Sequence, residues 1–155
     1  MSATDQNRTV LVRRTSAISG EDAILFGARL LLVCLFVVFG WDKLLHFGTT
    51  VNMMSQRGLP LPEAAAAIAV GAEVLLCLLI VVGAWTRPLA LVLAVYTLAT
   101  GLIGHRFWEL EGAARYANAI NFYKNLSIVG GFLLLYATGA GQYSLDAKLP
   151  SRDTS

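Results

Sequence analysis

Two ionisable residues stand inside long apolar stretches of the sequence, and they are the first candidates for chemistry. Arg29 lies a few residues into the first stretch, and Glu73 lies near the middle of the second. A charged side chain within a bilayer is energetically expensive and often marks a site of binding or proton exchange. If the two stretches form antiparallel helices, Arg29 and Glu73 come close enough for a structural ion pair. Alternatively, Arg29 extends to the lipid head groups, and Glu73 binds a proton or faces a ligand cavity.

A second group of polar residues lies where the apolar stretches end. Asp42 and His46 are four residues apart and therefore share one helix face. Together with Glu73, the candidate ligand-binding residues are Lys43, His46, Glu73, His105, Asn121, Lys124 and Asn125. If these ends converge, the side chains could hold a small anion, a quinone head group or a lipid head group, and histidine could exchange protons near neutral pH. The alternative is that these residues are polar because helix ends contact water.

Motifs that would define a reaction are missing from the sequence. The two cysteines, Cys34 and Cys77, stand alone in apolar stretches, and no Cys/His spacing is typical of a metal site. We therefore expect no metal, and we interpret both cysteines as small hydrophobic residues. The sequence also lacks a nucleophile elbow, a phosphate-binding loop and a metalloprotease motif. Whether the protein is an enzyme, and which residues would be catalytic, stays open at this point.

The elements that must position these residues are apolar segments long enough to cross a bilayer, which takes about 20 residues. Of the 155 residues, 56% are hydrophobic and 14% are charged, and the mean hydropathy is +0.62. Lipid offers the backbone no hydrogen-bond partners, so each segment must be helical or belong to a closed barrel, and continuous apolar runs exclude alternating barrel strands. We therefore predict an all-α membrane protein, a four-transmembrane-helix bundle with short interfacial helical segments. The predicted spans are residues 24–45, 64–83, 88–104 and 120–138.

The connections predict an asymmetric bundle. The second and third spans are joined by a tight turn, whereas the connections over 47–61 and 105–119 are longer and lie at the same membrane face. We expect a short interfacial helix in the first of these connections, and we expect the two to pack together as a cap. The predicted organisation is a polar N-terminal segment, a membrane domain and a polar C-terminal tail, at residues 1–22, 23–141 and 142–155.

The distribution of charge predicts location and excludes one class of partner. The net charge of +2 and the lack of a basic, aromatic-rich face argue against nucleic-acid binding. Lysine and arginine are somewhat more frequent on the side that holds both termini, which predicts that both termini are cytoplasmic. We thus expect a multi-pass protein of the bacterial inner membrane, with the lipid bilayer as its first partner.

The order of several short motifs resembles the DoxX family of small bacterial membrane proteins over roughly residues 24–146. The motifs, together with Glu73, are Phe39-Gly40-Trp41-Asp42-Lys43-Leu44, Gly58-Leu59-Pro60, Gly83-Ala84-Trp85-Thr86-Arg87-Pro88, Gly104-His105-Arg106-Phe107-Trp108, Asn121-Phe122-Tyr123-Lys124-Asn125-Leu126 and Ser144-Leu145-Asp146. The resemblance implies a four-helix membrane bundle. It also implies that five residues occupy polar positions of the family pattern: Lys43, Glu73, His105, Asn121 and Lys124.

The resemblance implies little about activity. Some DoxX relatives are linked to thiosulfate:quinone oxidoreduction, and others to membrane-bound redox or oxidative-stress assemblies. One hypothesis is therefore a redox-linked or quinone-associated membrane subunit that acts with a soluble or membrane redox partner. A second is a quinone-reactive module in which Glu73 and His105 move protons. A third is a small-solute transporter or channel, which would need a homo-oligomer because four spans are few for alternating access.

Overall fold

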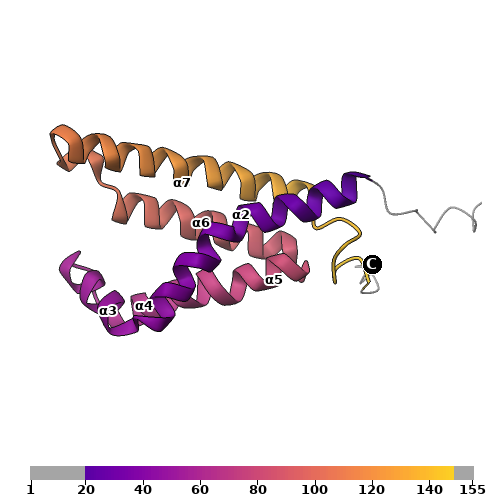
Figure 1. Cartoon of the computed structure of the whole chain (residues 1–155), viewed down its shortest axis with the longest axis horizontal. Helices are drawn as coiled ribbons and strands as arrows, with labels where there is room; N and C mark the ends of the chain where they lie inside the picture. Colours follow the sequence, from indigo (N-terminus) through magenta and orange to yellow (C-terminus); the bar gives the residue numbers. More distant parts are fainter. Residues whose placement is uncertain (1–19, 149–155) are drawn as a thin grey trace, which may run out of the picture.

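Helices make up most of residues 20–148, the part of the chain that the computed structural model describes (Figure 1). No strand occurs within those residues. The α-helices are α2 (Gly20–Leu45), α3 (Phe47–Gln56), α4 (Pro62–Val70), α5 (Cys77–Val82), α6 (Thr86–Gly104) and α7 (Gly112–Thr138). A π-helical segment, η2 (Gly71–Leu76), joins α4 to α5, and a 3-10 turn, η3 (Phe107–Glu109), precedes α7. The prediction of an all-α protein is confirmed.

Within residues 20–148, three helical segments are long and apolar enough to cross a membrane: Gly20–Leu45, Pro62–Val82 and Thr86–Glu109. The fourth predicted span lies within α7, which has 27 residues but does not join this group. Its N-terminal half carries Lys124 and three asparagines between positions 118 and 125, and these lower its mean hydropathy. A fourth crossing therefore stays a prediction.

The helix ends follow local sequence signals. Acidic Glu21 and Asp22 stand in the first turn of α2, and basic Lys43 stands in its last turn, so both ends complement the helix dipole. Between α5 and α6 the chain reverses at once, because Gly83 and Trp85 adopt left-handed backbone conformations with φ of 70° and 48°. An added Cβ at Gly83 would collide with Ser144 and Arg29, so this turn requires glycine for space as well as for conformation.

The core runs along the middle of the bundle. α6 and α7 pack against each other over their length (Figure 1), and α2 packs mainly against η2 and α5. Buried Val33 and Phe36 of α2, Leu93 of α6 and Phe132 of α7 belong to one cluster, and the rings of Phe36 and Phe132 lie 5.7 Å apart. Large apolar side chains remain exposed on the outer faces of the helices. Such an extensive apolar surface is what a lipid environment would cover.

One end of the bundle is closed by the segment that follows α7. The backbone N–H of Asp146 donates to the Gly83 carbonyl at 2.8 Å. The Asp146 carboxylate accepts the N–H groups of Trp85 and Thr86 at 2.7 and 2.8 Å, which caps the start of α6. Residues 142–148 of the predicted polar tail are thus docked against the α5–α6 turn. Residues 149–155 of that tail, and residues 1–19 of the predicted N-terminal segment, lie outside the described residues.

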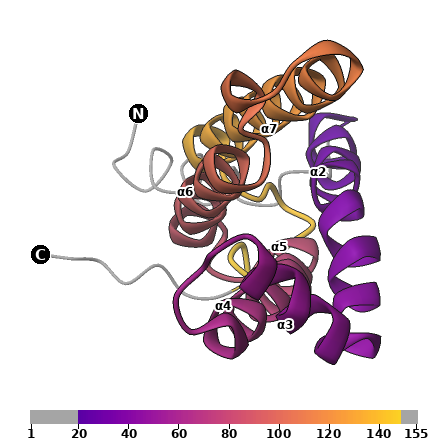
Figure 2. The ribbon, with the colours of Figure 1, turned by 90° about the vertical axis from the view of Figure 1, so that its left-hand side faces the viewer.

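The opposite end of the bundle is open. α3 packs against α4 and α2, whereas η3 packs against α7 (Figure 2). The rings of Phe107 and Trp108 pack against Phe122 of α7 in tilted and edge-on arrangements, with centroids 5.5 and 5.9 Å from that of its ring. The expected cap of two connections packed together is therefore wrong. Each connection packs on the helix next to it, because its aromatic or apolar side chains find partners there.

Candidate functional site

Glu73 lies in the π-helical segment η2, in the interior of the bundle. Its residue is 6% exposed. A π-helical turn inside an α-helix is rare and is frequently found at functional sites, because it shifts the direction of nearby side chains. The π-helical segment η2 interrupts the α-helical hydrogen bonding of the continuous helix from Pro62 to Val82. It lies at the level where Glu73 faces α2 and α6.

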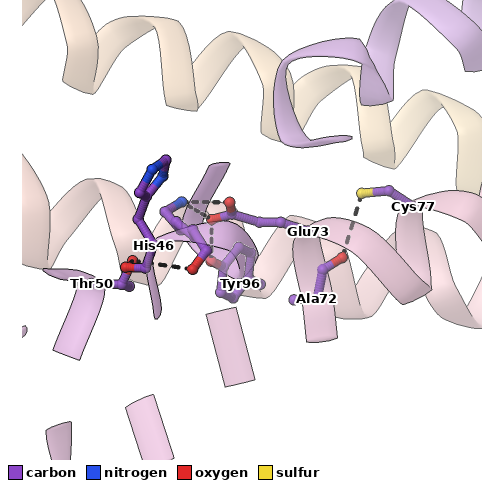
Figure 3. A network of polar contacts seen from close by, with 7 residues as sticks. His46, Thr50, Ala72, Glu73, Cys77 and Tyr96 are labelled. Atoms are coloured by element: carbon purple, nitrogen blue, oxygen red, sulfur yellow. Dashed lines mark hydrogen bonds and ion pairs between the residues drawn. The ribbon is translucent and has the colours of Figure 1, made fainter. Parts of the chain in front are cut away.

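The Glu73 carboxylate binds side chains from two other helices (Figure 3). The ammonium group of Lys43, on α2, donates to Oε1 at 2.6 Å and also contacts Oε2. The hydroxyl of Tyr96, on α6, donates to Oε1 at 2.6 Å. Because the Lys43 side chain is 23% exposed and that of Glu73 is 7% exposed, this salt bridge is largely shielded from solvent. Charged hydrogen bonds of this kind are stronger than neutral ones.

Gly40 explains how Lys43 reaches Glu73. A Cβ built on Gly40 would lie 2.6 Å from the Glu73 Cβ, closer than two carbon atoms can approach. The absence of a side chain at Gly40 therefore lets α2 lie directly against η2. Lys43 follows three residues later on the same helix and so lies beside the carboxylate.

Arg29 has different partners from those expected. Its guanidinium donates from Nη1 to the carbonyls of Ile80 and Val81 at 3.2 and 3.1 Å, and from Nη2 to the carbonyl of Tyr143. The side chain is fully buried, and its guanidinium carbon lies 5.4 Å from the centre of the Phe26 ring.

The predicted Arg29–Glu73 ion pair is therefore not formed: the salt bridge of Glu73 goes to Lys43. The physical reason is depth along α2. Arg29 is level with the C-terminal end of α5, where the carbonyls of Ile80 and Val81 accept its hydrogen bonds. Lys43 lies about four turns further along α2, at the level of Glu73.

A cavity of about 430 Å³ lies beside the Lys43–Glu73–Tyr96 network. Five of the seven candidate ligand-binding residues line it: Lys43, His46, Glu73, His105 and Asn125. The other lining residues are Leu35, Phe36, Phe39, Asp42, Thr49, Thr50, Met53, Met54, Arg57, Tyr96, Thr100 and Gly104. Lys124 is exposed and Asn121 is half-buried on α7, and neither lines this cavity.

The two histidines that line the cavity have different polar partners. Nδ1 of His46 lies 3.0 Å from Oδ1 of Asp42, and both side chains are exposed. Nδ1 of His105 lies 3.4 Å from Oδ1 of Asn118. Within residues 20–148, no three histidine, cysteine, aspartate or glutamate side chains are grouped closely enough to hold a metal ion.

Tyr96 is the residue that the sequence interpretation missed. It stands in the middle of an apolar stretch and was read only as part of a span. A usable signal existed, because a tyrosine hydroxyl buried among apolar residues generally needs a hydrogen-bond partner. Glu73 was the nearest acceptor that the sequence offered within a neighbouring span.

The arrangement combines acid, base and hydrogen-bond donors in one place. Glu73 can hold or release a proton, and Lys43 and Tyr96 carry N–H and O–H groups. Asp42, Arg57 and the histidines supply further charge or proton exchange nearer the open end. Met53, Met54 and Phe39 provide apolar contact area. Such a cavity, mostly apolar with a few convergent polar groups, is typical of a small-molecule site.

Comparison with known proteins places the chain in a family. Residues 24–106 match the DoxX family model. The inner membrane protein YphA of Escherichia coli is 48% identical over 130 residues, which cover 84% of this chain and 93% of the relative. The inner membrane protein YqjF of the same organism is 37% identical over 132 residues, or 83% of this chain and 94% of the relative.

A more distant likeness reaches a eukaryotic protein. The Surfeit locus protein 4 homolog of Schizosaccharomyces pombe is 34% identical over 74 residues, which cover 46% of this chain and 24% of that protein. No solved structure matches the chain. The match to the family model begins within α2 and ends at the residue before η3, so it includes Lys43, Glu73, Tyr96 and His105. The chain is thus an inner membrane protein that belongs to the DoxX family.

Proposed function

We propose that the cavity beside Glu73 binds a quinone head group, and that the protein is a redox-linked membrane subunit acting with a partner that exchanges electrons with this quinone. The observation that carries the proposal is the shielded Lys43–Glu73–Tyr96 network in the wall of a cavity of about 430 Å³. Sites for small molecules commonly have volumes of about 300–1,000 Å³.

The donors in this wall suit the head group. A quinone ring is planar, is largely apolar and carries carbonyl acceptors. The ammonium of Lys43 has three N–H donors, so a donor remains for a ligand beside its contacts to Glu73. Phe39, Met53 and Met54 offer apolar surface for the ring. The residues present therefore fit the group.

The proposed roles of the residues follow from their chemistry. A bound quinone supplies electron transfer coupled to proton transfer. Lys43 binds and orients one carbonyl, and Tyr96 holds the Glu73 carboxylate in position. Glu73 holds or releases the proton at its carboxylate oxygen. His105 and His46, which line the same cavity nearer the open end, exchange protons with water.

Quinone binding by the detergent-purified protein tests the proposal. Dimethylnaphthoquinone is a suitable probe, because methyl groups block both reactive positions of its quinone ring. The compound therefore does not alkylate the exposed thiol of Cys34. We expect saturable binding by the wild type and a loss of at least about tenfold in affinity in Lys43→Met, which is about 1.4 kcal/mol. Absence of saturable binding by the wild type would refute the proposal.

Two further variants complete this test. Glu73→Gln keeps the size of the side chain but removes its charge, and we expect weaker binding than in the wild type. Glu63→Gln is the matched control, because Glu63 is an exposed glutamate in the first turn of α4. Equal weakening by Glu63→Gln and Glu73→Gln would point to a general effect of charge and contradict the proposed site.

We further propose that α7 is a fourth crossing and that both termini are cytoplasmic. A helix of 27 residues spans about 40 Å, enough for a bilayer, and α7 runs alongside α6, a candidate span. Alkaline phosphatase fused after Leu110 should be active in the periplasm, whereas the same enzyme fused after Ser155 should be inactive. An active enzyme at the C-terminus would overturn this topology.

A further inference from the structure

A second, apolar cavity of about 230 Å³ adjoins the candidate site. It lies between α6 and the part of the chain that runs from the end of α3 through α4. The residues that line it are Met54, Arg57, Leu59, Ala65, Ile68, Ala69, Tyr96, Ala99, Thr100, Ile103 and Gly104. Most of these side chains are aliphatic, so the cavity suits hydrocarbon rather than a polar solute.

The two cavities share a wall. Five residues line both cavities: Met54, Arg57, Tyr96, Thr100 and Gly104. Tyr96 therefore has two neighbours of opposite character: its hydroxyl donates to Glu73, and its residue also borders the apolar cavity. A molecule that touches Tyr96 can thus reach the polar network on one side and aliphatic side chains on the other.

Small side chains create the apolar cavity. Ala65 and Ala69 of α4 and Ala99 of α6 leave space where larger residues would fill the gap between the helices. At its border, Ile68 is 65% exposed and Ile103 is 42% exposed. These two isoleucines belong to candidate membrane spans, so this side of the cavity faces the lipid. Hydrocarbon chains could enter from the bilayer without crossing water.

We infer that the ligand of this protein is an amphipathic molecule taken from the membrane, with its polar head at Lys43, Glu73 and Tyr96 and its hydrocarbon chain in the apolar cavity between α4 and α6. This inference rests on the proposed function and adds the class of ligand: a lipid-soluble compound with a chain rather than a free aqueous solute. The apolar cavity contributes to affinity through van der Waals contacts with the chain, because moving hydrocarbon from lipid into an apolar cavity gives little hydrophobic gain.

Two ligands with one head group separate the cavities experimentally. Dimethylnaphthoquinone has no chain, and methylnaphthoquinone with a geranyl chain has the same ring. Ala65→Phe and Ala99→Phe each place an aromatic ring in the apolar cavity. Ala67→Phe is the matched control, because Ala67 is an exposed alanine on the same helix that lines neither cavity.

We expect both filling variants to weaken binding of the geranyl compound about tenfold and to leave dimethylnaphthoquinone within about twofold of the wild type. Ala67→Phe should change neither affinity, which also controls for partitioning of the chain into detergent. Each variant must first show the elution volume and melting temperature of a folded protein. Two separate variants are used so that the site is still tested if one of them does not fold.

The outcomes distinguish the inference from the proposed function. If the wild type binds both compounds and both filling variants leave the affinity for the geranyl compound unchanged, the chain site is wrong while the head-group site stands. If the filling variants weaken both compounds equally, the two cavities do not act separately and the inference is also wrong. If the wild type binds neither compound, both the proposed function and the inference fail.

Discussion

The hydroxyl of Tyr96 donates a hydrogen bond of 2.6 Å to Oε1 of Glu73, and this contact joins α6 to the π-helical segment of the neighbouring helix. The same oxygen accepts a hydrogen bond from Lys43 on α2. One carboxylate thus links three helices at the wall of the cavity.

Replacing Tyr96 by phenylalanine removes one donor from the carboxylate and leaves the ring in place. A hydrogen bond to a charged group contributes about 1.5–3 kcal/mol, so Tyr96→Phe should lower the melting temperature of the purified protein by several degrees. Tyr116→Phe is the control, because Tyr116 is 72% exposed. An unchanged melting temperature in Tyr96→Phe would show that the hydroxyl contributes no stability.

The salt bridge predicts non-additive effects of substitution. Lys43→Met leaves a shielded carboxylate without its cation, and Glu73→Gln leaves a shielded ammonium without its anion. Removal of one partner of a buried pair costs about 3–5 kcal/mol, whereas removal of both is often much less harmful. The double variant should therefore be more stable than the sum of the single effects predicts, as measured by thermal or denaturant unfolding in one detergent. Additive losses would contradict direct coupling between Lys43 and Glu73.

Close approach of α2 to η2 depends on Gly40. In Gly40→Ala, the new methyl group would overlap the Glu73 Cβ, so α2 must move away and the Lys43–Glu73 contact should lengthen. We expect lower thermal stability and weaker quinone binding. Gly27→Ala is the matched control on the same helix, since no atom lies within 4 Å of its added Cβ. Equal behaviour of the two variants would show that the helix contact at Gly40 is not tight.

Asp146 fastens the segment after α7 to the start of α6. Asp146→Ala removes the acceptor of two backbone N–H groups and should lower stability by about 1 kcal/mol. Limited proteolysis should then cut between residues 139 and 148 faster than in the wild type. Glu111→Ala is the control, because Glu111 precedes α7 without a capping hydrogen bond from its side chain. Equal cleavage rates in the wild type and Asp146→Ala would contradict the role of this cap.

The connection over 105–119 shows where reasoning along the sequence falls short. We expected it to pack against the connection over 47–61, but its Phe107 and Trp108 pack on Phe122 of α7 instead. An aromatic residue in the sequence indicates that its side chain will pack against another group, but it does not identify that group. Tyr96 shows the same limit. Its hydrogen-bond partner, Glu73, is identified only by the packing of α6 beside η2.

The sequence by itself determined that this is a helical membrane protein, where its apolar helices lie, and which polar residues stand near their ends. These properties are local, since the length and hydropathy of each segment decide whether it can cross a bilayer. Only the tertiary structure decided that Lys43 rather than Arg29 pairs with Glu73, and that Tyr96 completes the network. The choice depends on the depth and rotation of one helix against another, which Gly40 sets by allowing close contact at one point on α2.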